Sequence, residues 1–317
     1  MEKPFISICI PAYKRAENLQ RLLRSVASQT FRDYEIIITD DSPDDSVAGL
    51  VRQFSASLPI QYSKNEPAAG MPGNWNIALQ KASGQWLKLM HDDDWFAHPG
   101  ALQRFAAAAA NTSDAFIFSA CNNIYSSSGR EVNEFLSGWK KDMLEETPLN
   151  LFFANVIGHP STVMHRKDET ISYDSNYKWV VDIDFYIRYM LAHRGYEYID
   201  EMLVNIGTDD TQVSYSLYKN PKVEVPEYLS MLAKFPPGLL LQHEYVFHCV
   251  WNLVKRFRIK NPETIKDLGY NGQLPDHIED IIAFQKPIPR IVIKQTNWSK
   301  MLMKRCYKKI KGQGAYK

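Results

Sequence analysis

Three aspartates stand side by side at Asp92, Asp93 and Asp94, directly after an apolar segment and directly before Trp95. Adjacent carboxylates at the end of a buried strand repel one another and lose hydration. We therefore expect a cation at this place, and carboxylate oxygens are the ligands that Mg²⁺ and Mn²⁺ prefer. The alternative is a solvated loop that caps a helix, but the apolar strand and Trp95 argue against full solvation.

A second acidic stretch, DDSPDD at 40–45, follows another apolar segment. Aspartate and serine are favoured at helix N-termini, so Asp44 and Asp45 are predicted to cap the next helix. Asp41 stands at the end of a strand, where open α/β sheets bind their ligands, and we expect it to contact one. Asp40 is expected to support the loop.

The elements that must position these residues are apolar strands that alternate with helices. The pattern predicts strands at 5–12, 34–41, 60–65, 85–91 and 114–122, and helices at 16–29, 44–57, 72–83 and 99–111. Later segments predict a strand at 161–167, a helix at 182–194 and a strand at 197–207. This alternation indicates an α/β fold with a mainly parallel, Rossmann-like sheet flanked by helices. We predict one α/β domain over 1–215 and a helical region over 216–317.

Composition excludes several classes of protein. The 317 residues carry a net charge of only +1, so no general attraction for nucleic acid is expected. The sequence has neither GxGxxG nor GxxxxGK[ST], which argues against a dinucleotide fold and a P-loop. No segment approaches the length of a transmembrane helix or of a signal peptide's apolar region. Widely spaced cysteines argue against a zinc site or disulfide framework and favour the reducing cytosol; they are Cys9, Cys121, Cys249 and Cys306.

The last 37 residues, 281–317, contain ten Lys or Arg and no Asp or Glu. Aromatic and aliphatic residues are interspersed among these cations. One interpretation is a basic amphipathic helix that lies on an anionic membrane surface. The other is a solvated, partly disordered tail, and the sequence leaves both open.

Four segments, 6–46, 73–95, 158–167 and 180–189, carry a resemblance to a known family. In this order and spacing, the chain resembles the family 2 glycosyltransferases, which have the GT-A fold, and is similar to members of the bacterial polysaccharide and O-antigen type. The resemblance covers about residues 5–215. It implies transfer of a sugar from a nucleoside diphosphate sugar to an acceptor hydroxyl, with inversion at the anomeric carbon.

The resemblance also implies roles for residues at the donor side. The turn that contains Pro11, Tyr13 and Arg15 would hold the nucleoside, together with Asp41, which would accept a hydrogen bond from uracil. Asn74 would contact the nucleotide or sugar, although turn formation explains it equally well.

HDDD at 91–94 matches the family's DxD motif. By this match, Asp92 would contact the ribose, Asp93 would bind Mn²⁺ or Mg²⁺, and Asp94 would complete the ion's shell through water. The register of the match is open by one residue, because His91 stands where many relatives carry aspartate. His91 is either a further metal ligand or a structural histidine.

On the acceptor side, the resemblance implies contacts from His159 and Ser161. Asp182 is the implied general base and Asp184 the second choice, because Val181 replaces the glutamate of the usual Glu-Asp-x-Asp pattern. Arg188 is predicted to form a salt bridge. The loop 205–214 would close over the donor.

We therefore predict a metal-dependent transferase that uses a UDP-sugar and extends a glycan, such as a lipid-diphosphate-linked O-antigen or capsule intermediate. It would work in the cytoplasm, at the inner face of the membrane if the basic tail binds there. Two alternatives remain. A sugar nucleotidyltransferase would need a glycine-rich first turn, which PAYKRAEN lacks. A non-catalytic scaffold of a glycan assembly complex would not need the acidic triplet.

Overall fold

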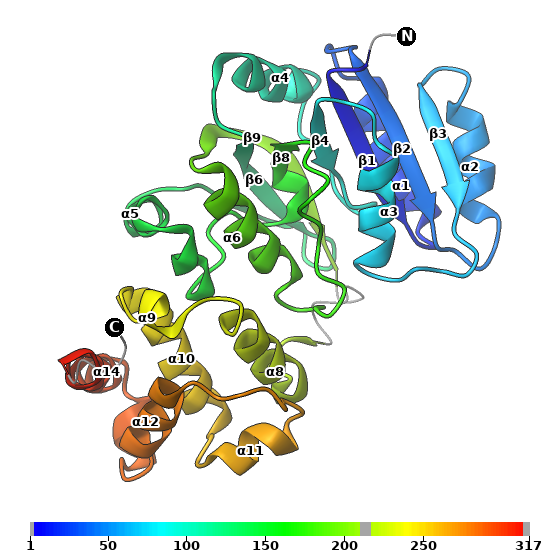
Figure 1. Ribbon diagram of the computed structural model, residues 1–317. Helices are drawn as coiled ribbons and strands as arrows, with labels where there is room; N and C mark the ends of the chain where they lie inside the picture. The colour runs from blue at the N-terminus through cyan, green and yellow to red at the C-terminus, as the bar shows by residue number, and fades with distance from the viewer. Residues whose placement is uncertain (1–2, 210–216, 313–317) are drawn as a thin grey trace. The chain divides into compact units, whose positions relative to one another are not determined.

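The computed structural model describes residues 3–209 and 217–312 (Figure 1). The chain divides into two compact units. The first comprises Met1–Lys141, Val156–Ser175 and Asp184–Gln212, and the second comprises Asp142–Asn155, Asn176–Ile183 and Val213–Lys317. The predicted domain boundary at residue 215 stays a prediction. Two segments from the earlier part of the chain, Asp142–Asn155 and Asn176–Ile183, join the second unit.

The first unit is built on a single sheet with the strand order β3-β2-β1-β4-β8-β6-β9-β5. Its first four strands are parallel, as predicted, and are β3 (Ile60–Lys64), β2 (Tyr34–Asp40), β1 (Ile6–Ala12) and β4 (Trp86–Leu89). All residues of β1, β2 and β4 are buried, which explains their largely apolar sequences. Because β1 pairs in parallel with both β2 and β4, the carboxyl ends of these strands meet at one edge of the sheet.

The rest of the sheet is mixed. Strand β6 (Phe116–Tyr125) pairs in parallel with β9 (Glu197–Thr208), whereas β8 (Val163–Arg166) runs antiparallel to both β4 and β6. Two more antiparallel strands, β7 (Arg130–Glu134) and β5 (Trp95–Phe96), pair with β6 and β9. The sequence did not predict these two, because one is exposed and polar and the other has two residues.

Helices cover both faces of the parallel half (Figure 1). Ile6, Ile8 and Ile10 of β1 join one core with α1 (Ala16–Ala27), α2 (Ser46–Phe54) and α4 (Ala101–Asn111). Successive side chains of a strand point to opposite faces, so the alternate residues of β1 face the other side. There α3 (Gly73–Lys81) buries Trp75 and Leu79. Pro72 is the residue before α3, as its position in the sequence predicted.

The helices beyond residue 216 confirm the predicted helical character of that region. They are α8 (Pro221–Leu232), α9 (Pro237–Leu240), α10 (Glu244–Phe257), α11 (Pro262–Asp267), α12 (Asp276–Gln285), α13 (Arg290–Lys294) and α14 (Thr296–Gly312). Two further helices occur earlier in the chain, α5 (Trp139–Glu146) and α6 (Val181–His193). Short 3₁₀ segments occupy Pro148–Phe152 and Pro160–Thr162.

The basic C-terminal segment is helical over Thr296–Gly312, as the amphipathic-helix interpretation expects, and its binding to a membrane stays a prediction. Part of its apolar face is already used within the second unit. Met303, Tyr307 and Ile310 are buried, and the Tyr307 hydroxyl donates a hydrogen bond to the Leu241 carbonyl at 2.9 Å. Trp298 and Met301 are each 54% exposed. Across residues 3–209 and 217–312, no helix is both long enough and apolar enough to cross a membrane.

Candidate active site

The carboxyl ends of β1 and β4 bring two predicted groups of site residues together. The backbone N–H of Tyr13 donates a hydrogen bond to Oδ2 of Asp92 at 3.2 Å. Arg15 forms an ion pair with Asp93, with 3.0 Å between Nη1 and Oδ2. Residues almost 80 positions apart are thus adjacent, because their strands are paired neighbours. The Tyr13 ring is 52% exposed and offers a surface on which a flat ligand can stack.

His91, Asp93 and Asp94 form a cluster in which one potential ligand atom of each lies within 4.8 Å of the others. Asp93 and Asp94 are both buried, at 8% and 2% exposed. The His91 ring packs on Trp75 with a centroid distance of 4.6 Å, and its buried Nε2 has no hydrogen-bond partner in the described structure. Two carboxylates and one free imidazole nitrogen at this spacing fit a divalent cation with oxygen and nitrogen ligands.

The electrostatics of the cluster also fit a cation. Burial removes hydration from Asp92 and Asp94, and the negative charge of Asp93 adds a smaller effect in the same direction. Together they raise the pKa of Asp92 to about 7 and the pKa of Asp94 well above its usual range. Burial lowers the pKa of His91 to about 4, so its imidazole is neutral near pH 7 and can act as a ligand. A divalent cation would offset the repulsion between these carboxylates.

Three supporting residues were not identified from the sequence. Arg21 donates from Nη2 to the Asp93 carbonyl at 2.8 Å, and its guanidinium lies 3.7 Å from the Trp95 ring centroid. The fully buried Lys88 donates to the Ser161 carbonyl, and burial lowers the pKa of Lys88 to about 7. An arginine on a helix and a lysine within a strand have no sequence pattern that marks them as supports for a distant loop.

Gly207 is the third. Its N–H donates to Oδ1 of Asp94 at 3.1 Å, and a Cβ built on it would lie 2.4 Å from the Asp93 carbonyl oxygen. Only glycine allows β9 to approach the acidic loop so closely. Gly207 belongs to the segment 205–214 that was predicted to close over the donor. Residues 205–208 are in β9, whereas 210–214 lie outside the described residues.

Ser161, which was predicted to contact the acceptor, lies in the interior. Its side chain is fully buried, and its hydroxyl accepts a hydrogen bond from the His91 N–H at 2.9 Å. The same hydroxyl is hydrogen-bonded to Asp94 and lowers that residue's pKa. Ser161 therefore supports the acidic loop from the interior. His159, two residues earlier, is exposed, and its contact with an acceptor stays a prediction.

The acidic stretch after β2 serves mainly to hold loops. The carboxylate of Asp41 accepts hydrogen bonds from the Asn65 side chain at 2.8 Å, from the Ala69 N–H at 3.0 Å and from the Gly70 N–H at 2.7 Å. A carboxylate has about four acceptor positions, and these hydrogen bonds use three of them. Asp41 therefore has about one position left for a contact with a base. Asp40 supports the loop as predicted, by accepting from Tyr62 and from the Ser42 N–H.

Two other predictions near this loop have different outcomes. Asp44 accepts from the Ser46 N–H at the start of α2, as predicted, but Asp45 pairs with Lys64 at 3.1 Å instead of capping the helix. Asn74 is 5% exposed, and its side chain bonds with the Ala12 and Thr39 carbonyls and with Asn65. This internal network favours the turn-forming explanation of Asn74 over a nucleotide contact. Pro11 is buried within β1.

The two aspartates of α6 have different surroundings. The side chain of Asp184 is 0% exposed and pairs with Arg188 at 2.7 Å, so the predicted salt bridge of Arg188 is present. Asp182 accepts a hydrogen bond from Asn155 at 2.8 Å and has no cationic partner among the described residues. Burial raises the pKa of Asp182 to about 6, and the Asn155 hydrogen bond opposes this shift. A carboxylate that titrates near neutral pH is suited to general base catalysis.

The first unit is an α/β sheet domain with a buried acidic cluster at the carboxyl end of its parallel strands. Comparison with known families identifies it further: residues 7–169 match the model of glycosyl transferase family 2. The chain therefore belongs to this family. The predicted family, the GT-A fold and the class of enzyme, a glycosyltransferase, are confirmed.

Related sequences cover part of the chain. An uncharacterized protein of Mycobacterium tuberculosis, MT1568, is 29% identical over 203 residues, which are 60% of this chain and 63% of that protein. A GalNAc(5)-diNAcBac-PP-undecaprenol beta-1,3-glucosyltransferase of Campylobacter jejuni is 28% identical over 172 residues, 46% of this chain and 55% of its own length. The chain thus spans less than two thirds of either relative.

Solved structures share the fold across nearly the whole chain. TarS 1–349 of Staphylococcus aureus, in complex with UDP-GlcNAc, has a TM-score of 0.57 and 16% identity, covering 98% of this chain and 92% of that chain. The mannosyltransferase PcManGT of Pyrobaculum calidifontis, in complex with GDP-Man and Mn²⁺, has a TM-score of 0.55 and 14% identity, covering 97% of this chain and 85% of that chain. At these identities the likeness shows the fold alone.

Proposed function

We propose that this chain is an inverting, divalent-cation-dependent glycosyltransferase that moves a sugar from a UDP-sugar to a glycan carried on a lipid diphosphate. The observation that carries the proposal is the cluster of His91, Asp93 and Asp94 at the end of β4, with ligand atoms within 4.8 Å of one another. Arg15, in the turn after β1, pairs with Asp93 of the cluster, and Tyr13 of the same turn bonds to the neighbouring Asp92, so the proposed cation site adjoins the proposed nucleoside site.

The donor would lie over this edge of the sheet. The exposed Tyr13 ring would stack on the base, and Asp41 would use its remaining acceptor position for the N–H group of the base. Asp92 is available to the ribose through the oxygen that does not accept from Tyr13. The named complexes of the two structural neighbours, one with UDP-GlcNAc and one with GDP-Man, are compatible with a nucleotide sugar and leave the base to be tested.

Asp93 and Asp94, with His91, would hold Mn²⁺ or Mg²⁺, which would supply positive charge to the diphosphate as it leaves. The chain itself holds the acidic loop in position for this role. Arg15 bonds to the carboxylate of Asp93 and Arg21 to its carbonyl, while Gly207 bonds to Asp94. Preorganised charges of this kind need little rearrangement during the reaction.

Asp182 is the proposed general base. Its carboxylate would take the proton of the acceptor hydroxyl while that oxygen bonds to C1 of the sugar and the bond from C1 to the diphosphate breaks. Attack opposite to the leaving group inverts the configuration at C1. The near-neutral pKa of Asp182, which has no cationic partner among the described residues, supports this role, whereas Asp184 is paired with Arg188.

The acceptor assignment rests on chemistry in the second unit and on the relatives. Helices α13 and α14 carry many cations, and three large apolar side chains beside them are exposed, Ile291, Trp298 and Met301. Such a surface suits an anionic membrane, where aromatic and basic residues bind together. The Campylobacter relative is named for an acceptor linked to undecaprenol diphosphate. We therefore place the reaction at the cytoplasmic face of the membrane.

Calorimetric titration of UDP, GDP, dTDP and CDP, each with Mn²⁺ and with EDTA, tests the proposal. We expect UDP to bind only with the metal, and Asp93→Ala to lose this binding. Asp267→Ala, which removes an exposed aspartate of α11, is the matched control and should bind as the wild type does. Metal-dependent binding of GDP or dTDP alone would change the donor and keep the mechanism. Absence of metal-dependent binding for all four nucleotides would contradict the cation-dependent mechanism and favour a scaffold.

A further inference from the structure

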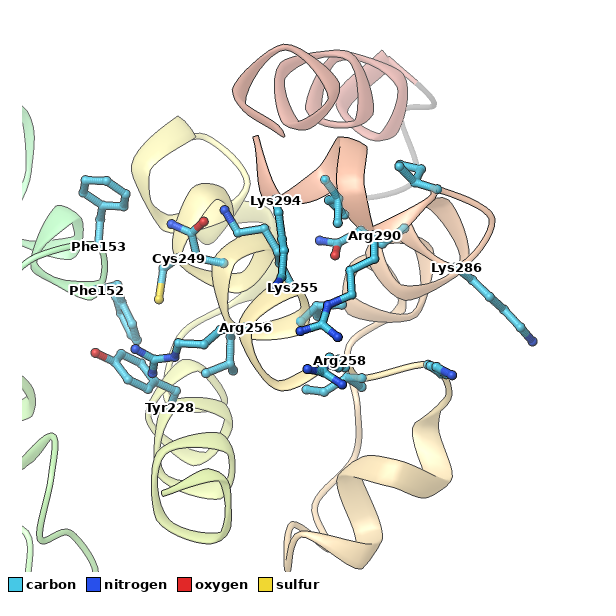
Figure 2. Close-up of a pocket in the computed structure, with 18 residues that line it drawn as sticks. Phe152, Phe153, Tyr228, Cys249, Lys255, Arg256, Arg258, Lys286, Arg290 and Lys294 are labelled. Carbon is cyan, nitrogen blue, oxygen red and sulfur yellow. The ribbon is translucent and has the colours of Figure 1, made fainter. Parts of the chain in front are cut away.

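A cavity of about 850 Å³ lies within the second unit (Figure 2). Its walls come from α10 and the residues that follow it, from α13 and the segment that joins it to α12, and from residues of α8 and of the chain at 152–153. Small-molecule sites have volumes of about 300–1,000 Å³, so the cavity has the size of a ligand site. It shares no residue with the acidic cluster of the first unit.

The charge of the lining is of one sign. None of the residues that line the cavity in the described structure is acidic, and Arg256 is paired with Glu224 nearby. Six further cations line it: Lys255, Arg258, Lys260, Lys286, Arg290 and Lys294. Five of these six, all except Lys255, have no ion pair or side-chain hydrogen bond with any described residue. Gathering unpaired cations around one cavity costs electrostatic energy that a bound anion would offset.

Two arginine side chains point into the cavity. Figure 2 shows Arg258 and Arg290 directed into the space between α10 and the α12–α13 segment, whereas Lys286 points away from it. Guanidinium groups match phosphate oxygens with two parallel hydrogen bonds. Arg258 has a φ of +55° as the residue after α10, in the left-handed conformation that favours glycine. The backbone conformation at this position therefore does not favour arginine over glycine.

The lining also contains an apolar part. Phe152, Phe153 and Tyr228 line one region of the cavity, and Ile288 and Ile293 line another. A small inorganic anion would leave these side chains without a contact. We propose that the cavity is a second, metal-independent anion site that binds the diphosphate group of an organic diphosphate ester, with the apolar side chains contacting the organic group.

The probes are inorganic pyrophosphate and farnesyl diphosphate, titrated calorimetrically into the full chain in EDTA. The chelator removes the cation on which the proposed donor site depends, so binding in EDTA reports on the cavity. The test variant is Arg258→Gly with Arg290→Gln. Glycine accepts the backbone conformation of residue 258, and Arg290 is exposed, so the fold should survive. Lys308→Gln removes an exposed cation of α14 that does not line the cavity.

We expect both probes to bind the wild type and the Lys308→Gln variant, and the double variant to bind at least about tenfold more weakly, which is about 1.4 kcal/mol. The single Arg290→Gln variant replaces the double variant if thermal unfolding shows that the latter is misfolded. Asp93→Ala should bind both probes normally, so failure of the donor site and failure of the cavity are separable. Tighter binding of farnesyl diphosphate than of pyrophosphate would indicate a lipid-linked ligand. Equal binding would contradict the proposed contact between the apolar side chains and an organic group.

Two further outcomes would overturn the proposal. One is the absence of binding of either probe in EDTA. The other is an equal loss of binding in the double variant and in Lys308→Gln, because this would show a general attraction of the basic surface for anions.

Discussion

The acidic loop of the first unit and the basic cavity of the second unit differ in whether their charged side chains have partners within the chain. In the loop, Asp92 accepts from Tyr13, Asp93 pairs with Arg15, and Asp94 accepts from Gly207. In the cavity, Arg258 and Arg290 have no partner of opposite charge among the described residues. The loop is held by the chain, whereas the cavity exposes its charges to whatever enters it.

This difference separates two ways of building an ionic site. A site that must hold a cation in one geometry needs its ligands fixed by hydrogen bonds. Substitution of the residues that make these hydrogen bonds therefore disturbs the site. A site that only recognises an anion can leave long side chains free to close around it. We therefore expect substitutions near the loop to affect stability and catalysis together, and substitutions in the cavity to affect binding alone.

The largest expected effect concerns Asp182, which belongs to the second unit by its contacts. Asp182→Asn should lower kcat by about 10²–10⁴-fold with little change in KM, because the amide cannot take the acceptor's proton. A base must be deprotonated, so the wild-type kcat/KM should fall below about pH 6, the value to which burial raises the pKa of Asp182. Steady-state rates between pH 5 and pH 8 measure both effects.

Two further variants sharpen this test. Asn155→Ala removes a hydrogen bond that favours the charged form of Asp182, so the acidic limb should move to higher pH. Asp184→Asn breaks the partly buried pair with Arg188 and should lower the free energy of unfolding by about 1–3 kcal/mol while the limb stays in place. An acidic limb that persists in Asp182→Asn at reduced rate would assign the base to another residue.

A smaller effect is expected at Gly207. A methyl group there would meet the Asp93 carbonyl at 2.4 Å, so Gly207→Ala should displace the acidic loop. Overpacking of this kind costs about 1–3 kcal/mol of stability, and metal-dependent UDP binding should weaken with it. Chemical denaturation and calorimetry measure the two losses. Gly49→Ala is the matched control: in α2 its nearest neighbour would be the Arg52 side chain at 3.7 Å, and alanine should be neutral or stabilising there. Unchanged stability and UDP binding in Gly207→Ala would show that the close approach is not needed.

The smallest effect is that of salt. Exposed charges are screened over about 10 Å at 0.1 M salt and about 3 Å at 1 M, and buried ones much less. Pyrophosphate binding in EDTA should therefore weaken about tenfold or more between these concentrations. Metal-dependent UDP binding should change by less, because Asp93 and Asp94 are buried. Equal salt dependence at the two sites would erase the distinction between a preorganised site and an open one.

The sequence predicted the parallel half of the sheet well, because strands such as β1 and β2 are rich in isoleucine and flanked by amphipathic helices. It predicted the mixed half less well. Strand β8 was predicted as a strand, but its antiparallel direction depends on pairing with β4 and β6, which local periodicity does not encode. Strand β7 has exposed polar residues and therefore no alternating pattern strong enough to identify it.

What the sequence by itself determined is the chemistry available at two strand ends: an acidic triplet after one apolar segment, Tyr13 and Arg15 after another, and a family resemblance that names their use. Only the tertiary structure decided how these groups are held. Gly207 approaches Asp93 and Asp94 because β9 passes beside the loop, and Ser161 bonds to His91 from the interior. The basic cavity likewise exists only because separate helices bring their cations together. Residue types follow from local sequence, whereas distances between remote residues follow from packing.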